Sequence, residues 1–540
     1  MALLDKGSRS FTRRVVLSFI GGGLFASSPL APTAWAQGSA FEQSVALSAA
    51  KYPVIAAFYQ ARDYQPIWTG PGDAVRRRAL FRALIKAPNH GLPVARYDAD
   101  QLTRDFGSIR SAKARGILEV ETTKMFLTYV HDIQSGAVEP SKIDVDMAIK
   151  LPRRDPAEQL VAFMQDGPDR FLKSLPPKHP DYVRLMKEKV RLERIIQAGG
   201  WGPTVSGKAI KPGQKGRRVL ELRLRLSAMG FKRLGISPTY DSKLEAAVTQ
   251  FQIDHGLNVD GVAGAGTLKA LNVSPEQRLE QVIIGLERQR WLNKDRGRRH
   301  IFVNQADFRA FVMDDGKPTL TTRVVVGKAY KFRTPEFTDE MTHMIINPTW
   351  HVPKSIARKE YLPQLKKDPD ALRRHGLRMT DVRGRVVDPT TLDYEEYGIN
   401  NFPFDLKQPP GSRNALGKVK FMFPNKFNIY LHDTPSKSLF NREVRAYSHG
   451  CVRVQKPFEL AYTLLGRQSD QPENLFHDAL ATRRETQIDL VQPIPVHLVY
   501  HTAWVAADGR ANYRADIYGR DKKVLKALLN AGVVMSGVQS

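Results

Sequence analysis

The feature that most constrains the fold of this 540-residue chain is a change of hydrophobic pattern near Arg299. Before that point apolar residues recur at helical spacing, as in Val219, Leu222 and Leu226. After it, short apolar and alternating runs bounded by turns begin with residues 301–303, a pattern typical of β-strands. A chain of this length is too long for a single hydrophobic core. The sequence therefore predicts a multidomain α+β protein, helical in its first half and mostly β in its second.

The amino-acid composition limits the kinds of molecule that the protein is expected to bind. Hydrophobic content of 42% and charged content of 25% are ordinary for a globular protein, but a net charge of +27 is not. Strongly basic proteins usually bind nucleic acid or an anionic surface. Here the Lys and Arg residues are spread over the whole sequence, without a dense basic tail, an RNA-binding signature or a glycine-rich phosphate loop. We therefore expect general attraction to an acidic matrix and no nucleic-acid partner.

Residues 1–36 have the pattern of a secretory signal peptide. Three arginines precede a short apolar stretch from Val15 to Ala26, and an A-x-A cleavage site ends at Ala36. The paired Arg13-Arg14 also resembles a twin-arginine export signal. We expect cleavage after Ala36 and export to the periplasm or cell envelope. If the segment stays uncleaved it is a membrane anchor, and no later stretch of the sequence is long and apolar enough to span a bilayer.

Hydrophobic periodicity and the positions of turn-forming residues divide the rest of the chain into segments. They are 41–201 (helical), 211–273 (a compact helical module), 274–298 (a linker helix), 299–520 (a mostly β domain) and 521–540 (a C-terminal tail). In the compact module, Ser242 and Glu245 are placed as a capping box at the start of the second helix. Within the β domain, the charged stretch 354–415 is rich in Pro and Gly and predicts an insertion.

The chemistry is concentrated between Asn428 and Val454. Cys451 is the only cysteine in the sequence, which excludes a disulfide within the chain. An isolated cysteine is often a small buried hydrophobic residue. This one directly follows His449 and Gly450, which are not typical neighbours of a residue in an apolar core. An imidazole can take the proton of a thiol, and His432 lies nineteen positions upstream. Cys451 is therefore a candidate nucleophile.

Local patterns place both residues near the ends of regular elements. Phe427, Ile429 and Leu431 alternate with polar residues and predict a strand that ends at His432. Pro457 can occupy the first position of a helix. Cys451 then lies in a glycine-containing turn between strand and helix, where backbone N–H groups can face a developing oxyanion.

These residues resemble the active-site signature of the L,D-transpeptidases, cysteine enzymes that cross-link peptidoglycan. The match consists of His432 followed by the block Ser448-His449-Gly450-Cys451-Val452-Arg453. The resemblance implies that Cys451 is the nucleophile and His432 its base, oriented by the carbonyl of Asp433, with the amides of Gly450 and Cys451 as oxyanion donors. The candidates for substrate binding are Arg453, His449, Ser448, Tyr430 and Trp350.

Other segments resemble further parts of the large members of this family. Residues 58–68 and 90–93 are similar to the scaffold region, and 211–273 resembles a three-helix peptidoglycan-binding module. The resemblance thus implies a helical scaffold, a peptidoglycan-binding module and a β-sandwich catalytic domain, with 354–415 as a lid over the cleft.

The resemblance also implies a reaction. Cys451 accepts the acyl group of the third residue of a tetrapeptide stem, D-Ala leaves, and the side-chain amine of a second stem takes the acyl group in a 3→3 cross-link. The implied partners are peptidoglycan stem peptides and glycan, and no metal or organic cofactor is needed. Three alternatives stay open: water as acceptor (an L,D-carboxypeptidase), a non-catalytic wall-binding protein, and a zinc site built from His432, His449 and Cys451.

Overall fold

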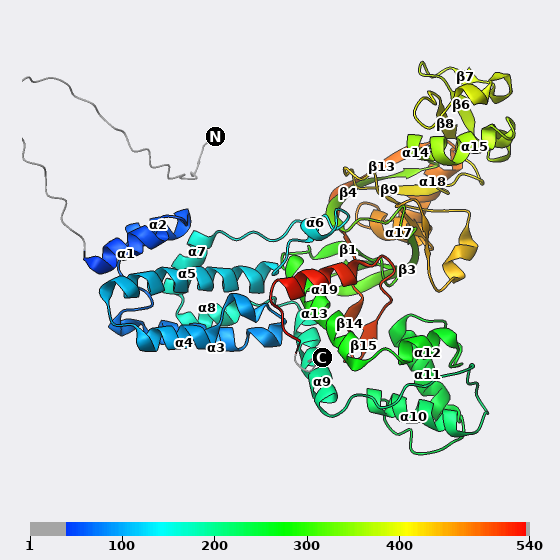
Figure 1. Cartoon of the computed structure of the whole chain (residues 1–540). Coiled ribbons are helices and arrows are strands. Elements are labelled where there is room, and N and C mark those ends of the chain that lie inside the picture. Colours follow the sequence, from blue (N-terminus) through cyan, green and yellow to red (C-terminus); the bar gives the residue numbers. More distant parts are fainter. Residues whose placement is uncertain (1–38, 536–540) are drawn as a thin grey trace, which may run out of the picture.

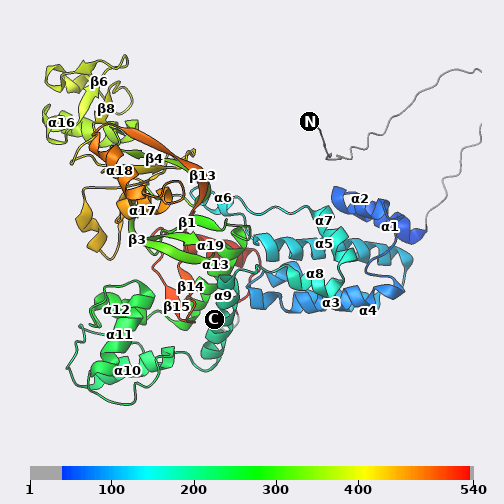
Figure 2. The same ribbon diagram turned by 180° about the vertical axis from the view of Figure 1, so that it is seen from behind.

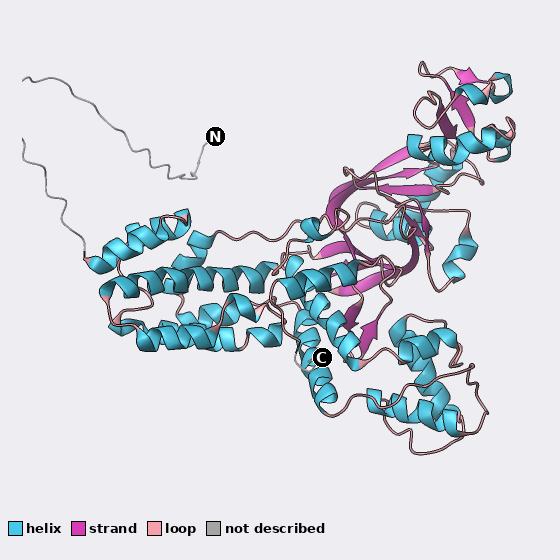
Figure 3. Cartoon of the chain, in the orientation of Figure 1, coloured by secondary structure: helices cyan, strands magenta, loops and turns pink. Residues whose placement is uncertain are grey.

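The computed structural model describes residues 39–535, so the signal-peptide interpretation of residues 1–36 lies outside the described residues. Figure 1 shows a bundle of helices on one side of a central β domain, a small helical module beside that domain, and a small subdomain at its far end, for which the name lid is kept as a label. Colouring by secondary structure separates the helical regions from the β domain (Figure 3). No helix within residues 39–535 is long and apolar enough to cross a membrane.

The N-terminal region packs its helices around the long α5. Its helices are α1 (Ala40–Ala49), α2 (Pro53–Gln60), α3 (Ala74–Ile85), α4 (Ala99–Ser108), α5 (Ala112–Ser135), α6 (Pro140–Ile143), α7 (Pro156–Gln165) and α8 (Pro168–Ser174). The buried carboxylate of Glu119 on α5 accepts hydrogen bonds from the Tyr59 hydroxyl at 2.7 Å and from the amides of Ile67 and Thr69 at 2.6 and 2.8 Å. A buried carboxylate is tolerated because its lone pairs are bonded in this way.

The compact module consists of α10 (Arg217–Met229), α11 (Ser242–His255) and α12 (Ala265–Leu271) around a core of its own. The predicted capping box at Ser242 is wrong by one residue. The N-cap of α11 is Asp241, whose carboxylate accepts the amide N–H of Leu244 at 2.9 Å, and Ser242 is the first residue of the helix. Asp caps a helix as well as Ser does, so the sequence offered two adjacent candidates.

The helix expected as a linker lies at the centre of the molecule. α13 (Pro275–Trp291) packs against α5, α9 (Pro180–Gln197), α19 (Arg520–Asn530) and the hairpin strand β14. Its charged residues are buried as well as its apolar stripe, and Arg290 pairs with Glu287 at 2.6 Å. The segment expected as a tail contributes α19, whose Val524 and Leu528 are fully buried. Both segments are therefore part of the core in which the helical and β regions meet.

The β domain is a nine-stranded sheet that closes on itself. The strands are β1 (Arg299–Asn304), β2 (Arg309–Asp314), β3 (Lys317–Gly327), β4 (Phe337–Ile346), β9 (Val419–Met422), β10 (Leu431–His432), β11 (Ala446–Ser448), β12 (Val452–Val454) and β13 (Thr486–Val499). They run in the order β11-β3-β12-β10-β9-β4-β13-β1-β2, and β2 also pairs with β3. The two layers of the predicted sandwich are therefore joined by hydrogen bonds into one continuous sheet. The expected succession of helical regions and a mostly β catalytic-type domain is confirmed.

Shorter elements complete the β domain. The helices α17 (Pro457–Leu465) and α18 (Pro472–Ala481) follow β12, and β14 (Ala503–Val505) pairs with β15 (Ala511–Tyr513) in a hairpin. Leu460 and Leu464 on α17 and Phe476 on α18 join the hydrophobic core enclosed by the sheet.

The 354–415 stretch is a folded subdomain with a small core. Its sheet has the order β5-β8-β6-β7, and its elements are β5 (Trp350–His351), α14 (Lys354–Ile356), a π-helical turn (Ala357–Tyr361), α15 (Leu362–Leu365), α16 (Ala371–Arg374), β6 (Arg378–Thr380), β7 (Val386–Val387) and β8 (Asp405–Gln408). Leu365, Leu372 and Phe402 are fully buried within it. Figures 1 and 2 both show this lid at the end of the β domain remote from the N-terminal helices.

Candidate active site

Two short parallel strands bring the predicted residues together. In β10 and β12, Leu431 pairs with Val452 and His432 pairs with Arg453. Leu431 and Val452 are fully buried in the core. Because side chains alternate along a strand, the residues on either side of this pair, Tyr430, His432, Cys451 and Arg453, lie on the opposite face. A tyrosine, an imidazole, a thiol and a guanidinium thus share one face of the sheet.

The strand predicted to begin at Phe427 is shorter than expected. The side-chain oxygen of Asn425 accepts the amides of Phe427 and Ile429 at 3.0 and 3.2 Å, and Asn428 adopts a left-handed backbone with φ of 53°. An Asn side chain that bonds nearby backbone N–H groups competes with strand pairing. The resulting turn directs the carbonyl of Asn428 to the thiol of Cys451, with O to Sγ at 3.6 Å.

His432 is held in one orientation by its neighbour. Its Nδ1 lies 2.5 Å from the carbonyl oxygen of Asp433. A carbonyl only accepts, so Nδ1 carries the proton and Nε2 is left as the basic nitrogen. The carboxylate of Asp433 is itself fixed by the amide of Lys418 at 2.8 Å and by the ammonium of Lys437 at 2.5 Å. The predicted orienting role of the Asp433 carbonyl agrees with this geometry.

The turn that carries the thiol is stabilised by hydrogen bonds among its own residues. Gly450 has φ of 118°, and a Cβ there would lie 3.1 Å from the Ile429 side chain, so only glycine fits without strain. The Gly450 amide donates to the Ser448 hydroxyl at 3.1 Å, and that hydroxyl donates to the Cys451 carbonyl at 2.5 Å. In this state the Gly450 amide is therefore occupied, and its predicted oxyanion role requires that the bond to Ser448 be exchanged.

The reacting pair is neutral at rest. Burial raises the pKa of Cys451 to about 11, although hydrogen bonds from Tyr430 and the charge of Arg453 act in the opposite direction. Burial, with a smaller contribution from Arg453, lowers the pKa of His432 to about 3. Both shifts disfavour the charged form, as expected where water is excluded. These shifts favour a neutral thiol and a neutral imidazole over a thiolate–imidazolium pair.

His449 connects the active-site turn to the lid. Its Nε2 lies 2.5 Å from the Glu360 carboxylate in the π-helical turn of the lid, and its ring packs against Phe332 at a centroid distance of 4.6 Å. Trp350, at the lid's first strand, is half-buried. Of the five substrate-binding candidates, Tyr430 and Arg453 face the reacting groups, Ser448 braces the turn, and His449 and Trp350 lie at the junction with the lid.

Two hollows lie near the candidate catalytic residues. One, of about 300 Å³, lies between the lid and the catalytic strands, and Trp350 and Arg453 line it. The other, of about 350 Å³, is lined by His449, Gly450 and residues of the 330–335 loop. The first hollow thus reaches β12 at Arg453, and the second reaches the turn at His449 and Gly450.

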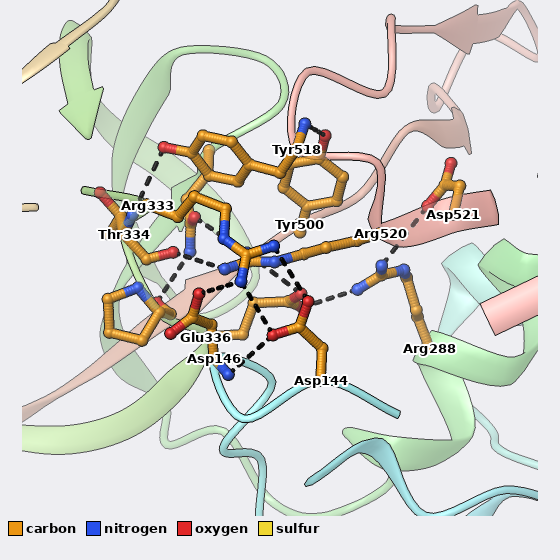
Figure 4. A network of polar contacts seen from close by, with 12 residues as sticks. Asp144, Asp146, Arg288, Arg333, Thr334, Glu336, Tyr500, Tyr518, Arg520 and Asp521 are labelled. Atoms are coloured by element: carbon orange, nitrogen blue, oxygen red, sulfur yellow. Dashed lines mark hydrogen bonds and ion pairs between the residues drawn. The ribbon is translucent and has the colours of Figure 1, made fainter. Parts of the chain in front are cut away.

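A buried polar network supports the 330–335 loop, and Figure 4 shows its members. The Thr334 hydroxyl donates to the Gly450 carbonyl at 2.6 Å, and the Thr334 carbonyl accepts from Arg520 at 2.8 Å. Arg333 forms a two-pronged pair with Asp144, at 3.0 and 3.1 Å. The sequence analysis missed Thr334 and Glu360, since nothing in the pattern around either residue indicates a contact with the active-site turn.

The zinc alternative is not supported by the placement of its ligands. Within residues 39–535, no group of three or more His, Cys, Asp or Glu side chains is placed to hold a metal ion.

Three family models match the chain. Residues 298–474 match a model described as "L,D-transpeptidase catalytic domain", 53–188 match "Scaffold domain", and 215–271 match "Putative peptidoglycan binding domain". A protein of Haemophilus influenzae named "Putative L,D-transpeptidase" is 37% identical over 239 residues, which are 44% of this chain and 48% of that protein. The chain therefore spans about half the length of this curated relative.

Solved structures of low similarity also match. An L,D-transpeptidase from Xylanimonas cellulosilytica is 15% identical, with 55% of this chain and 100% of that chain covered and a TM-score of 0.17. An L,D-transpeptidase from Stackebrandtia nassauensis is 14% identical, with 55% and 97% covered and a TM-score of 0.22. These TM-scores are too low to add to the assignment, which depends on the family models and the curated relative. Residues 298–474 thus match the L,D-transpeptidase catalytic domain, 53–188 match the scaffold domain and 215–271 match a putative peptidoglycan binding domain.

Proposed function

We propose that this protein is a peptidoglycan L,D-transpeptidase in which Cys451 is the nucleophile and His432 the general base. The observation that carries the proposal is the pairing of β10 with β12, which sets the imidazole and the thiol on one face of the sheet. The bond from His432 Nδ1 to the Asp433 carbonyl leaves Nε2 as the nitrogen that can take the thiol proton.

The first half-reaction is acylation. Cys451 Sγ attacks the carbonyl carbon of the third residue of a tetrapeptide stem while its proton passes to His432 Nε2. The C–N bond to the terminal D-Ala then breaks, and the imidazolium returns the proton to the leaving amine. A thioester and free D-Ala result. Because burial shifts both pKa values against the charged forms, we expect proton transfer to accompany attack and not to precede it.

The second half-reaction transfers the acyl group to an amine. The side-chain amine of a second stem attacks the thioester carbon, His432 takes a proton from that nitrogen, and the C–S bond breaks. The proton returns to the sulfur, so the thiol is restored and a 3→3 amide cross-link is formed. Arg453 lies beside both reacting groups, and its positive charge stabilises the thiolate character that develops on Cys451 as it attacks.

We further propose that the protein acts in the cell envelope. Its catalytic-domain and peptidoglycan-binding matches both describe domains that act on the cell wall, which lies outside the cytoplasm. The predicted signal peptide and the positive charge favour the same location.

Product analysis tests the proposed reaction. Purified protein incubated with disaccharide-tetrapeptides should release D-Ala and form dimers with a 3→3 linkage, identified by tandem mass spectrometry. Cys451→Ala should form no product, and His432→Ala should be about 10²- to 10⁴-fold slower. The exposed His477→Ala in α18 is the matched control and should retain full activity. Tripeptides without dimers would identify water as the acceptor, and full activity of Cys451→Ala would refute the nucleophile.

A further inference from the structure

The hollow between the lid and the catalytic strands is lined by basic side chains. Arg453 contributes from β12, and Arg374, His375 and Arg413 contribute from the lid. Among the residues that the structure describes, no Asp or Glu lines this hollow. A concave site of about 300 Å³ with three guanidinium groups is electrostatically suited to an anion, because converging positive charges raise the local potential.

The lid wall of this hollow is fixed by buried amides. The buried Gln408 donates through Nε2 to the carbonyls of His375 and Arg413, at 2.8 and 2.9 Å. The buried Asn414 donates to the carbonyl of Pro348 at 2.9 Å, next to the strand that carries Trp350. The segments that bear the lid arginines are thus bound to each other and to the base of the lid. Such support makes the wall a preformed surface.

The arginines retain donors for a ligand. Nε of Arg453 is buried and, within the described residues, has no hydrogen-bond partner. Arg374 pairs with Asp368 through Nη1 at 2.5 Å, and Arg413 donates to the Arg374 carbonyl through Nη1 at 3.5 Å. A guanidinium has five N–H donors, so each of these contacts leaves others free to bind a carboxylate.

The hollow is close enough to the nucleophile to hold another part of the same substrate. Cys451 and Arg453 are two residues apart on one strand face, which separates their positions by about 7 Å. One peptide residue spans about 3.5 Å. A group bound at Arg453 therefore lies within about two residues of the carbonyl that Cys451 attacks.

We infer that this hollow is a carboxylate subsite, in which Arg374 and Arg413 of the lid join Arg453 to bind a free carboxylate of the donor stem peptide close to the attacked carbonyl. The inference rests on the proposed function, which supplies a substrate with several carboxylates. It assigns the two lid arginines a role in substrate selection, and it explains how the lid contributes to specificity without adding a group to the Cys–His pair.

The test combines variants of the lid with variants of the substrate. Arg374→Gln/Arg413→Gln is compared with wild type on the tetrapeptide and on analogues amidated at one carboxylate at a time. With the free peptide the variant should lose about 10- to 100-fold in kcat/KM, the usual effect of losing hydrogen bonds to a charged group. With the analogue amidated at the recognised carboxylate, wild type and variant should have equal kcat/KM. The exposed lid residue Arg383 supplies the matched control, and Arg383→Gln should behave as wild type.

The outcomes separate this inference from the proposed function. An equal loss on every substrate, including all the amidated analogues, would mean that the arginines act only on the lid's structure and would overturn the subsite. Unchanged kinetics of the variant would overturn it as well. Binding of the free and amidated peptides to Cys451→Ala, measured by calorimetry, does not need turnover. Discrimination there would support the subsite even if no product were formed by wild type, whereas absent D-Ala release would count against the reaction.

Discussion

At the scale of single residues, the site depends on how burial changes two ionisations. Burial raises the pKa of Cys451 to about 11 and lowers that of His432 to about 3. An ordinary cysteine titrates near 8.5 and an ordinary histidine near 6.5. His432 must be neutral to accept a proton, and its lowered pKa favours the neutral imidazole in mild acid as well as at neutral pH. Its protonation therefore does not limit the enzyme in mild acid.

This difference predicts an unusual pH dependence of thiol modification. Only the thiolate reacts with iodoacetamide, so the rate at Cys451 should rise about tenfold per pH unit from pH 6 to 9.5 without a plateau. A cysteine-containing peptide, measured in parallel, should level off above about pH 9. A plateau for the enzyme near neutral pH would instead indicate a thiolate–imidazolium pair and contradict the neutral resting state.

The sequence provided the two candidate reacting residues but not all the residues that support them. Cys451 and His432 were found because they lie in a short stretch with a specific signature, and the structure places them on paired strands. Glu360 contacts His449 across 89 positions, and Thr334 contacts Gly450 across 116. Such long-range hydrogen bonds leave no local pattern, because ordinary Glu and Thr residues in loops and helices look the same.

At the scale of elements, the lid is a small subdomain that contacts the active-site turn through the hydrogen bond between Glu360 and His449. Glu360 lies in a π-helical turn, and irregular helical turns of this kind frequently occur at functional sites. The side chains of His449 and Glu360 are both partly exposed to solvent. Water therefore weakens the hydrogen bond between them. The lid is therefore attached firmly to its own sheet and more weakly to the turn that it covers.

Weakening that contact should open the lid more often. Glu360→Gln is expected to raise KM for the muropeptide several-fold, on the order of 1 kcal/mol, with a smaller effect on kcat. A bulky maleimide should also modify Cys451 faster relative to iodoacetamide. Glu395→Gln, which removes the exposed partner of Lys366 within the lid, is the control and should leave both properties unchanged. Identical kinetics for Glu360→Gln and wild type would show that this contact does not govern access.

Two elements differ from their sequence predictions for identifiable reasons. The strand before His432 is shortened because the Asn425 side chain bonds two backbone amides that a strand would use. The linker helix is buried because its charges are neutralised in pairs, such as Arg290 with Glu287. Hydrophobic periodicity identifies a helix and its apolar stripe, but it cannot show that charged residues on the other faces will find buried partners.

At the scale of the whole molecule, the polar network in Figure 4 connects the N-terminal region to the active-site turn. Asp144 follows α6 and is held by Arg333 and, at 2.7 Å, by Lys523 of α19. Glu336 pairs with Arg288 of α13 at 2.6 Å, and its amide donates to the Asp146 carbonyl at 2.7 Å. The loop between these anchors carries Thr334, which holds Gly450. The position of the catalytic turn thus depends on residues far away in the sequence.

Removing one anchor should therefore affect both stability and activity. Asp144→Asn removes the buried carboxylate from Arg333, which keeps its pair with Asp146 at 2.6 Å, and is expected to cost about 1–3 kcal/mol, visible as a lower Tm. Acylation of Cys451 should slow as well, measured below the transition. Asp169→Asn removes the partner of Arg82 in a pair that is about half exposed, and it should cost about 0–1 kcal/mol with normal acylation. A destabilised Asp144→Asn with an unchanged acylation rate would show that the network supports the fold and not the turn.

The most direct measurement for the central claim is the mass of the intact protein after brief exposure to a tetrapeptide donor without acceptor. Acyl transfer through Cys451 predicts an added mass equal to the donor minus D-Ala, located by peptide mapping on the fragment that contains Cys451 and absent from Cys451→Ala. The same adduct in Cys451→Ala, or D-Ala release by wild type with acyl mass on another residue, would contradict the assignment of Cys451 as the nucleophile.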